Sequence, residues 1–381
     1  PLKKIPLPPH HGARWAHTFL LTMGLAGRIH NMTRTVASRI QGKPMTITEF
    51  NFCAPNIYRH EGGLAMGSLS AFQNLGGIFV FEYAGYSHKT RWNTLNRTGG
   101  HLGWFGISVD PLRLLTQRVI ALLYLWGDVK QAPLSEQELL TITPEDYKLP
   151  QVQNYSFFRL AKDAAIPAPF HTLAFYTKIS MDSADRVPAG SHSLRELLSG
   201  KSLKIPHRGK GVYLPEQGKI TSSTGEISID AKTKTIRVVT PKSEGFTVTG
   251  KSAKGNRLSV SGSSTICSVF AGSLDGKELA ETSRALILHL TDVQATGRKK
   301  TTLGDFRIVY NWGNMDPYLL RKGKAEISLK NSAKGVVRIR ALDVNGAVLA
   351  EIPFRESKGS VIFTADTDQY GAMAYELLRI P

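Results

Sequence analysis

The second half of the sequence contains many short apolar segments separated by turns, and this pattern most constrains the fold. Residues 226–230 (EISID) and 235–239 (TIRVV), joined by a polar turn, predict a β-hairpin. Similar segments in which apolar and polar residues alternate lie at 257–261, 265–271, 284–291, 324–329, 336–342, 347–352 and 360–364. Short strands at such close spacing are typical of an antiparallel β-sandwich.

The first third of the sequence has a different pattern, in which apolar strands alternate with helices. Residues 45–49 and 77–81 predict two short buried strands, and residues 61–75 between them predict a helix. A strongly apolar helix is predicted at 111–127, and helical spacing also marks 14–40. Strand, helix, strand and helix in this order predict a parallel sheet with helices packed outside it.

These two patterns divide the chain into three regions. We expect an α/β region over residues 1–132 and an all-β region over 207–381. Residues 133–206 are rich in Pro, Ser and scattered charge, and they predict a connecting region with little structure of its own.

The composition limits the classes of partner and cofactor that we expect for the protein. A formal charge of +18 over 381 residues favours an anionic partner: nucleic acid, an anionic membrane surface or an acidic glycan. No basic motif interleaved with aromatic residues occurs, so we expect no nucleic-acid partner. No apolar stretch reaches the length of a membrane span. The two cysteines, Cys53 and Cys267, lie outside any Cys/His pattern, and we predict neither a metal site nor a cofactor.

Polar and aromatic residues follow both predicted strands of the first region. In α/β barrels, functional side chains lie at the carboxyl ends of strands, and Glu49 ends the first strand. A carboxylate there can attack a sugar carbon, but spacing alone is equally compatible with a structural ion pair or a helix cap. Side chains that bind hydroxyl groups or stack on sugar rings follow the strands: Asn51, Asn56, Tyr58, Arg59, Glu82, Tyr83, His88 and Trp92. For Glu82 a structural role is the stronger alternative.

A family resemblance adds weight to the catalytic interpretation. The segment KPMTITEFNFCAPNIYRHEGG, followed by LSAFQNLGGIFVFEYAGY, resembles the end of the catalytic barrel in retaining glycoside hydrolases of the clan that includes β-galactosidases and agarases. In that family the nucleophilic glutamate ends the seventh strand of a (β/α)8 barrel. SSTGEISIDAKTKTIRVVTPKSEGFTVTG, SLDGKELAETSRALIL and VRIRALDVNGAVLAEIP are similar to the β-sandwich that follows the barrel.

The resemblance implies a fold and an activity. Residues 1–132 would be the C-terminal part of a TIM barrel, with its strands seven and eight, followed by the sandwich. The protein would be a retaining glycoside hydrolase that cleaves a polysaccharide or glycan, with Glu49 as nucleophile and Tyr83 holding it. Asn51 would contact a sugar hydroxyl, and Tyr58 and Trp92 would line subsites. The positive charge makes an anionic glycan a candidate substrate.

The resemblance also implies that part of the site lies elsewhere. The acid/base glutamate of the family follows an asparagine, and no Asn-Glu dipeptide occurs in these 381 residues. We therefore expect a second polypeptide or a missing N-terminal segment to complete the barrel and supply that group. Secreted or periplasmic placement follows from the resemblance alone. The alternative is a non-catalytic carbohydrate-binding or scaffold protein with a remnant barrel.

Overall fold

Antiparallel β-sheets make up most of the computed structural model. The structure describes residues 35–36, 39–83, 105–132, 139–148, 174–182, 186–187, 189, 191–195, 211–214, 219–230, 233–303 and 306–381. The largest sheet has ten strands in the order β21 (Val348–Glu351), β20 (Val336–Leu342), β24 (Ala374–Ile380), β14 (Arg284–Leu290), β13 (Cys267–Ser273), β10 (Ser243–Val248), β9 (Thr235–Val239), β8 (Ile227–Asp230), β7 (Lys219–Thr221) and β6 (Val212–Leu214). A second sheet has five strands in the order β11 (Ala253–Lys254), β12 (Leu258–Ser261), β19 (Lys324–Lys330), β23 (Ser360–Asp366) and β22 (Phe354–Ser357).

The five-stranded sheet covers one face of the ten-stranded sheet. Every second residue of β19 and β23 is buried, which is the pattern of strands with one face on a core and one face toward solvent. These buried residues join side chains from the larger sheet in one apolar cluster, whose members include Phe246, Val269, Ile287, Ile327 and Phe363. The cluster is the core between the two sheets.

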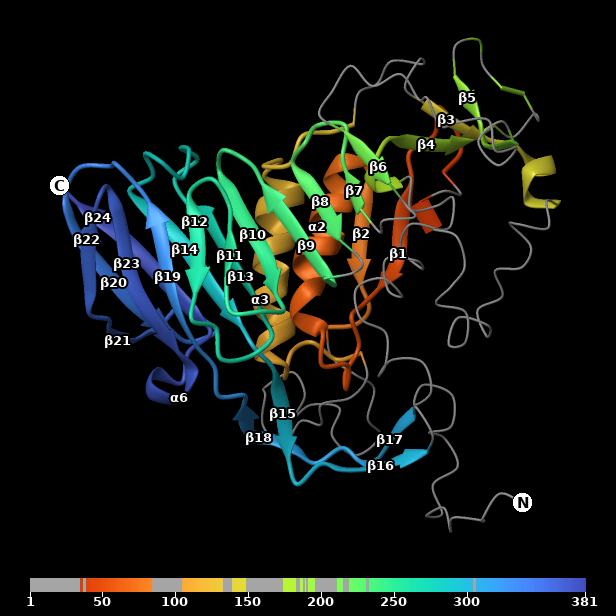
Figure 1. Cartoon of the computed structure of the whole chain (residues 1–381). Helices are drawn as coiled ribbons and strands as arrows, with labels where there is room; N and C mark the ends of the chain where they lie inside the picture. Colours follow the sequence, from red (N-terminus) through yellow and green to blue (C-terminus); the bar gives the residue numbers. More distant parts are fainter. Residues whose placement is uncertain are drawn as a thin grey trace.

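Two helices cover the other face of the ten-stranded sheet (Figure 1). They are α2 (Gly62–Phe72) and α3 (Pro111–Ile120), and a π-helical turn, η2 (Ala121–Leu125), continues α3. Their apolar side chains form a second core with those of β8, β9 and the middle of the sheet. Strands β10 and β13 are buried along their whole length because both of their faces are covered.

A small parallel sheet lies on the far side of the helices (Figure 1). Strands β1 (Thr46–Phe50) and β2 (Gly77–Val80) pair in parallel, and α2 connects them. The remaining elements are β3 (Leu139–Ile142) between β4 (Lys178–Met181) and β5 (His192–Ser193), the pairs β15 (Val293–Thr296) with β18 (Asn314–Leu320) and β16 (Lys299–Leu303) with β17 (Phe306–Asn311), and the short helices η1 (Arg59–Glu61), η4 (Pro144–Lys148) and α6 (Thr367–Tyr370).

The expected fold class, a C-terminal portion of a TIM barrel followed by a sandwich, is wrong. The described residues are mostly antiparallel strands with three short α-helices, and they fit an all-β fold. The alternation of strands and helices over residues 45–125 specifies one β–α–β unit, but it does not specify what packs on the helices. Here α2 and α3 bury their apolar side chains against an antiparallel sheet, and β1 and β2 form only a two-stranded sheet.

Several local predictions are confirmed. The predicted hairpin is β8 with β9, in which Ile229 pairs with Ile236. The predicted helices at 61–75 and 111–127 correspond to α2 and to α3 with η2. The helix predicted at 14–40 lies almost entirely outside the described residues. Both cysteines are buried and unpaired, and the described part of the chain contains no helix with the length and apolar character of a membrane span.

Close packing of α2 on the sheet depends on Gly245 in β10. A Cβ atom there would lie 2.7 Å from Leu64 Cδ2 and 2.9 Å from Phe270 Cδ2. We expect Gly245→Ala to lower the free energy of unfolding by about 1–3 kcal/mol through overpacking. Gly250→Ala is the matched control, since nothing lies within 4 Å of its Cβ position. Equal urea midpoints for the two variants would contradict this prediction.

The buried His289 in β14 predicts a pH-dependent stability. Neither ring nitrogen has a hydrogen-bond partner among the described residues, and burial lowers the pKa of His289 from 6.5 to about 4, although Asp366 opposes this. Between these two pKa values the unfolded chain binds a proton that the folded chain does not. The free energy of unfolding should therefore fall as the pH drops through this window, by about 3 kcal/mol in total. His289→Leu should lose this part of the pH dependence, as measured by denaturation at pH 7 and pH 4.

Candidate functional site

Glu49 lies in a β-bulge near the carboxyl end of β1. Ile47 pairs with Ile78 and Phe50 with Val80, so β1 advances three residues where β2 advances two. In a regular strand successive side chains point to opposite faces, but the bulge leaves both Thr48 and Glu49 exposed. Bulges of this kind redirect a side chain, and they are frequent beside active sites.

Glu82 and Tyr83 follow the neighbouring strand at the same edge of this sheet. The amide of Phe81 donates to the carbonyl of Phe50 at 2.9 Å, so the two chains still run side by side at this point. Backbone bonds hold the next residues, because Ile107 N donates to Glu82 O at 3.0 Å and Ser108 N donates to Tyr83 O at 2.8 Å. Glu82 is half-buried, whereas Tyr83 is 55% exposed.

The carboxylates of Glu49 and Glu82 have no polar partner within the described part of the chain. Neither side chain forms an ion pair or a hydrogen bond to another described residue. The bond expected between Tyr83 and Glu49 is not among the described contacts and stays a prediction. The edge of the β1–β2 sheet therefore carries two carboxylates and one phenol, and neither carboxylate has a polar side-chain partner among the described residues.

Asn51 supports this edge from within the protein. Its Nδ2 donates to the carbonyl oxygens of Phe81 and Phe105, each at 2.6 Å. Its Oδ1 lies 3.5 Å from Arg113 Nη1. Both amide hydrogens are thus used inside the protein, where they join the end of β1 to the segment that follows β2. Asn51 positions the loop that carries on from Glu49.

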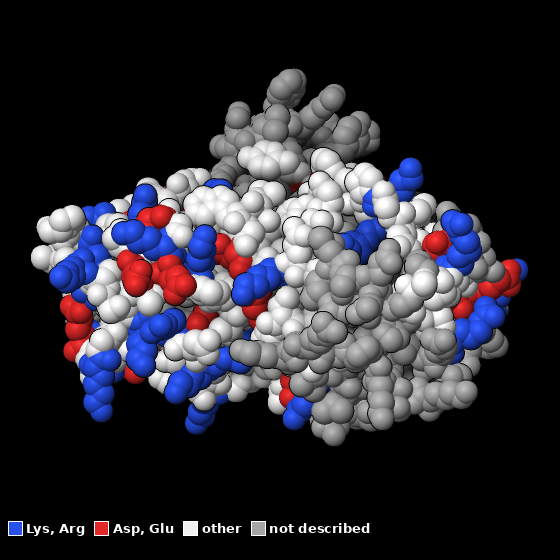
Figure 2. Space-filling model, turned by 90° about the horizontal axis from the view of Figure 1, so that it is seen from above, with Lys and Arg blue, Asp and Glu red and all other residues white. Residues whose placement is uncertain are grey.

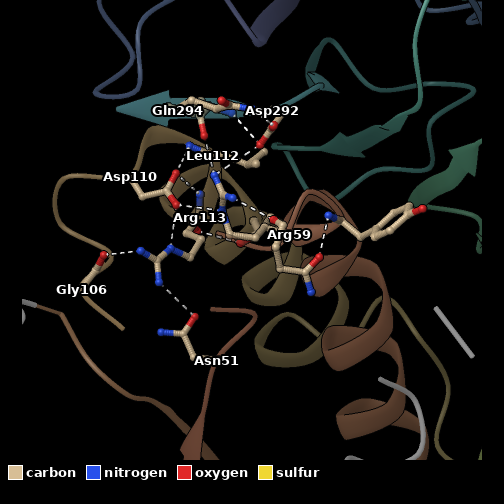
Figure 3. A network of polar contacts seen from close by, with 12 residues as sticks. Asn51, Arg59, Gly106, Asp110, Leu112, Arg113, Asp292 and Gln294 are labelled. Carbon is tan, nitrogen blue, oxygen red and sulfur yellow. Dashed lines mark hydrogen bonds and ion pairs between the residues drawn. The ribbon is translucent and has the colours of Figure 1, made fainter. Parts of the chain in front are cut away.

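Arg59 is fully buried and directs its guanidinium inward (Figure 3). Its Nε donates to Asp110 Oδ2 at 3.1 Å, its Nη1 to Asn56 O at 2.8 Å and its Nη2 to Val293 O at 2.8 Å. Nη2 also lies 3.4 Å from Asp292 Oδ1. The side chain expected to bind substrate therefore joins η1 to α3 and to the start of β15.

Asp110 lies between two arginines and caps α3. Its Oδ2 also accepts from Arg113 Nε at 2.7 Å, and its Oδ1 accepts from the amides of Leu112 and Arg113 at the helix N-terminus. Burial alone would raise the pKa of Asp110, but Arg59, Arg113 and these hydrogen bonds hold it below its ordinary value. Asp110 is therefore the ionised centre of a buried cluster.

The other predicted binding residues are dispersed. Asn56 is 1% exposed, and its Oδ1 accepts from the amide of Tyr58 at 2.9 Å. The ring of Tyr58 is half-buried and lies 6.2 Å from that of His60. His88 and Trp92 lie outside the described residues. The structure thus brings Glu49, Glu82 and Tyr83 to one edge, whereas the side chains of Asn51, Asn56 and Arg59 form hydrogen bonds within the protein.

Sequence reasoning missed Asp110, Arg113 and Asp292. Asp110 carried a signal, because an acidic residue directly before Pro111 at the start of an apolar helix is typical of an N-cap. Asp292 carried none, since it meets Arg59 across 233 residues of chain. Among the described residues, no three His, Cys, Asp or Glu side chains lie close enough together to hold a metal ion.

Searches of protein-family models, of curated proteins and of solved structures found no match to this chain. The interpretation of the site rests on its own residues and geometry.

Loss of the negative charge between the two arginines should be costly. Asp110→Asn leaves the buried guanidinium groups of Arg59 and Arg113 without their shared counter-charge. We expect the free energy of unfolding to fall by about 3–5 kcal/mol, measured by urea denaturation. Asp368→Asn, which breaks an exposed pair with Lys322, should change it by less than about 1 kcal/mol. Similar losses in the two variants would mean that the cluster does not stabilise the fold in this way.

Proposed function

We propose that the protein is a retaining glycoside hydrolase in which Glu49 is the nucleophile. The observation that carries the proposal is the bulge in β1, which turns this carboxylate out of the strand and leaves it without a partner among the described residues. A catalytic group needs a fixed position as well as exposure. Asn51 supplies it, two residues further on, through its bonds to the carbonyls of Phe81 and Phe105.

The reaction takes place in two steps. A carboxylate oxygen of Glu49 attacks the anomeric carbon while the bond to the leaving oxygen breaks, and a carboxylic acid protonates that oxygen. The resulting glycosyl ester is then attacked by water, which the same acid group, now a carboxylate, deprotonates. The sugar leaves with its original configuration and Glu49 is regenerated.

The mechanism requires a second carboxyl group about 5 Å from the nucleophile. We propose that a segment outside this sequence supplies it, because the chain lacks the Asn-Glu dipeptide in which the resembling enzymes carry that group. Glu82 has a different role here: it stands beside the nucleophile at the edge of the sheet and helps to position the sugar. Secreted or periplasmic placement belongs to the same proposal and rests on the family resemblance alone.

A second candidate function is carbohydrate binding without hydrolysis. Phe79 and Tyr83, on and just after β2, are 60% and 55% exposed, and such rings stack on sugars. In that case Glu49 would contribute a hydrogen-bond acceptor only, and its replacement by Gln would leave every measurable property except affinity unchanged.

Covalent trapping tests the nucleophile without the second carboxyl group. Dinitrophenyl glycosides with fluorine beside the anomeric carbon need no acid catalyst, because dinitrophenolate leaves unprotonated, and the fluorine slows release of the glycosyl ester. Across a panel of such glycosides we expect the intact mass to rise by one fluoroglycosyl unit on a peptide that contains Glu49. Glu49→Gln should reduce the labelling rate more than about a thousandfold, since it removes the attacking group.

Glu82→Gln is the matched control and should still be labelled, because this carboxylate does not attack the sugar. Labelling of another residue, or no labelling by any member of the panel, would contradict hydrolysis through Glu49 and favour the non-catalytic alternative.

A further inference from the structure

Arg298 has a guanidinium that the described protein does not satisfy. It lies in the turn between β15 and β16 and is half-buried. Its Nη1 is shielded from solvent and has no hydrogen-bond acceptor, and its side chain forms no ion pair with a described residue. An arginine carries five N–H donors, and a buried donor of a charged group that stays unpaired is costly. The site therefore lacks an acceptor.

The charged groups around Arg298 indicate that the missing acceptor is an anion. Burial lowers the pKa of Arg298, and nearby Arg59 lowers it further, while Asp292 opposes both. Asp292 is already engaged, at 3.4 Å by Arg59 and at 3.2 Å by Arg321.

Among the described residues, the cluster has an excess of two positive charges. Four guanidinium groups share two carboxylates there: Arg59, Arg113, Arg298 and Arg321 with Asp110 and Asp292. On the face shown in Figure 2, Lys and Arg side chains over the β-sheets are intermixed with Asp and Glu and form no continuous basic track. The arrangement suits a discrete anionic group better than a long polyanion bound by surface charge.

Arg298 lies near the buried cluster that supports the candidate site, because the charges of Arg59 and Asp292 both act on it. Strands β15, β16 and β17 lie on the side of the molecule toward which β1 and β2 point (Figure 1). A continuous set of contacts leads from Asn51, next to the nucleophile loop, through Arg113, Asp110 and Arg59 to the start of β15 (Figure 3). Arg298 comes two residues after β15 ends.

We propose that Arg298 binds an oxyanion carried by the substrate, a carboxylate or a sulfate ester, and that the glycan is therefore anionic. The planar guanidinium matches both groups because it can donate two parallel hydrogen bonds to two oxygens. This inference rests on the proposed function, since it names the substrate class of that site. The bound oxyanion supplies the acceptor that Nη1 lacks and offsets part of the excess charge.

The test measures binding in the absence of turnover. The Glu49→Gln protein is titrated calorimetrically with a polyuronate, a sulfated galactan and the corresponding neutral galactan, at an ionic strength of about 0.15 M so that exposed charges are screened. We expect one of the anionic polymers to bind. Adding Arg298→Met should weaken that binding at least about tenfold, as expected for the loss of a charge-assisted hydrogen bond. Binding of the neutral galactan should not change.

Arg338→Met on β20 is the matched control for net charge. Arg338 is half-exposed and pairs with Glu351, away from the cluster, and its replacement should weaken binding less than about twofold. Arg298→Met should fold, because it removes an unpaired buried charge and keeps an apolar stem of similar length. The parent for these comparisons is the Glu49→Gln protein, and a urea midpoint of the Arg298→Met variant at or above that of the parent checks folding. Inorganic sulfate should raise the urea midpoint of the parent but not that of the Arg298→Met variant.

The polymer that depends on Arg298 identifies the oxyanion as carboxylate or sulfate. The proposal is overturned if the parent binds neither anionic polymer, if Arg298→Met binds as tightly as the parent, or if Arg338→Met loses as much affinity. Binding that depends on Arg298 without trapping at Glu49 would leave the anion site in place and reject hydrolysis. Trapping at Glu49 without any effect of Arg298 would do the reverse.

Discussion

The buried pairing of Arg59 and Arg113 with Asp110 is the interaction on which the arrangement of the molecule depends. It joins η1, the segment that ends at Asp110, the first turn of α3 and, through Arg59 and Asp292, the start of β15. Buried charges are costly unless their partners are well placed. Here the hydrogen bonds of Arg59 run to a carboxylate and to two backbone carbonyls, so the cluster permits one relative placement of these segments.

This constraint also shapes the candidate site. Arg113 lies within 3.5 Å of Asn51, and Asn51 bonds to the segment after β2, so hydrogen bonds connect the edge that carries Glu49 to the buried cluster. The side chains that we propose to bind the ligand, Glu49, Glu82 and Tyr83, thus differ from Asn51, Arg59 and Arg113, whose side chains form hydrogen bonds within the protein. A loop that depended on its own contacts alone would hold a nucleophile less firmly.

In the proposed function, the same cluster supports both Glu49 and Arg298. Among the described residues, its two carboxylates are shared by four arginines, and Nη1 of Arg298 has no hydrogen-bond partner. In our proposal, the carboxylate of Glu49 and the guanidinium of Arg298 together would distinguish an anionic glycan from a neutral one by orientation as well as by charge.

The sequence by itself determined the local elements. The β8–β9 hairpin, α2, α3 and the short strands β1 and β2 follow from apolar periodicity and turn residues, which act over a few neighbours. It also located Glu49 at a strand end. Only the tertiary structure decided what covers the helices, that β1 and β2 form a separate pair instead of part of a barrel, and that Arg59 is an interior residue. These outcomes depend on packing and on ion pairs between distant segments, such as Arg59 with Asp292, and no local spacing encodes them.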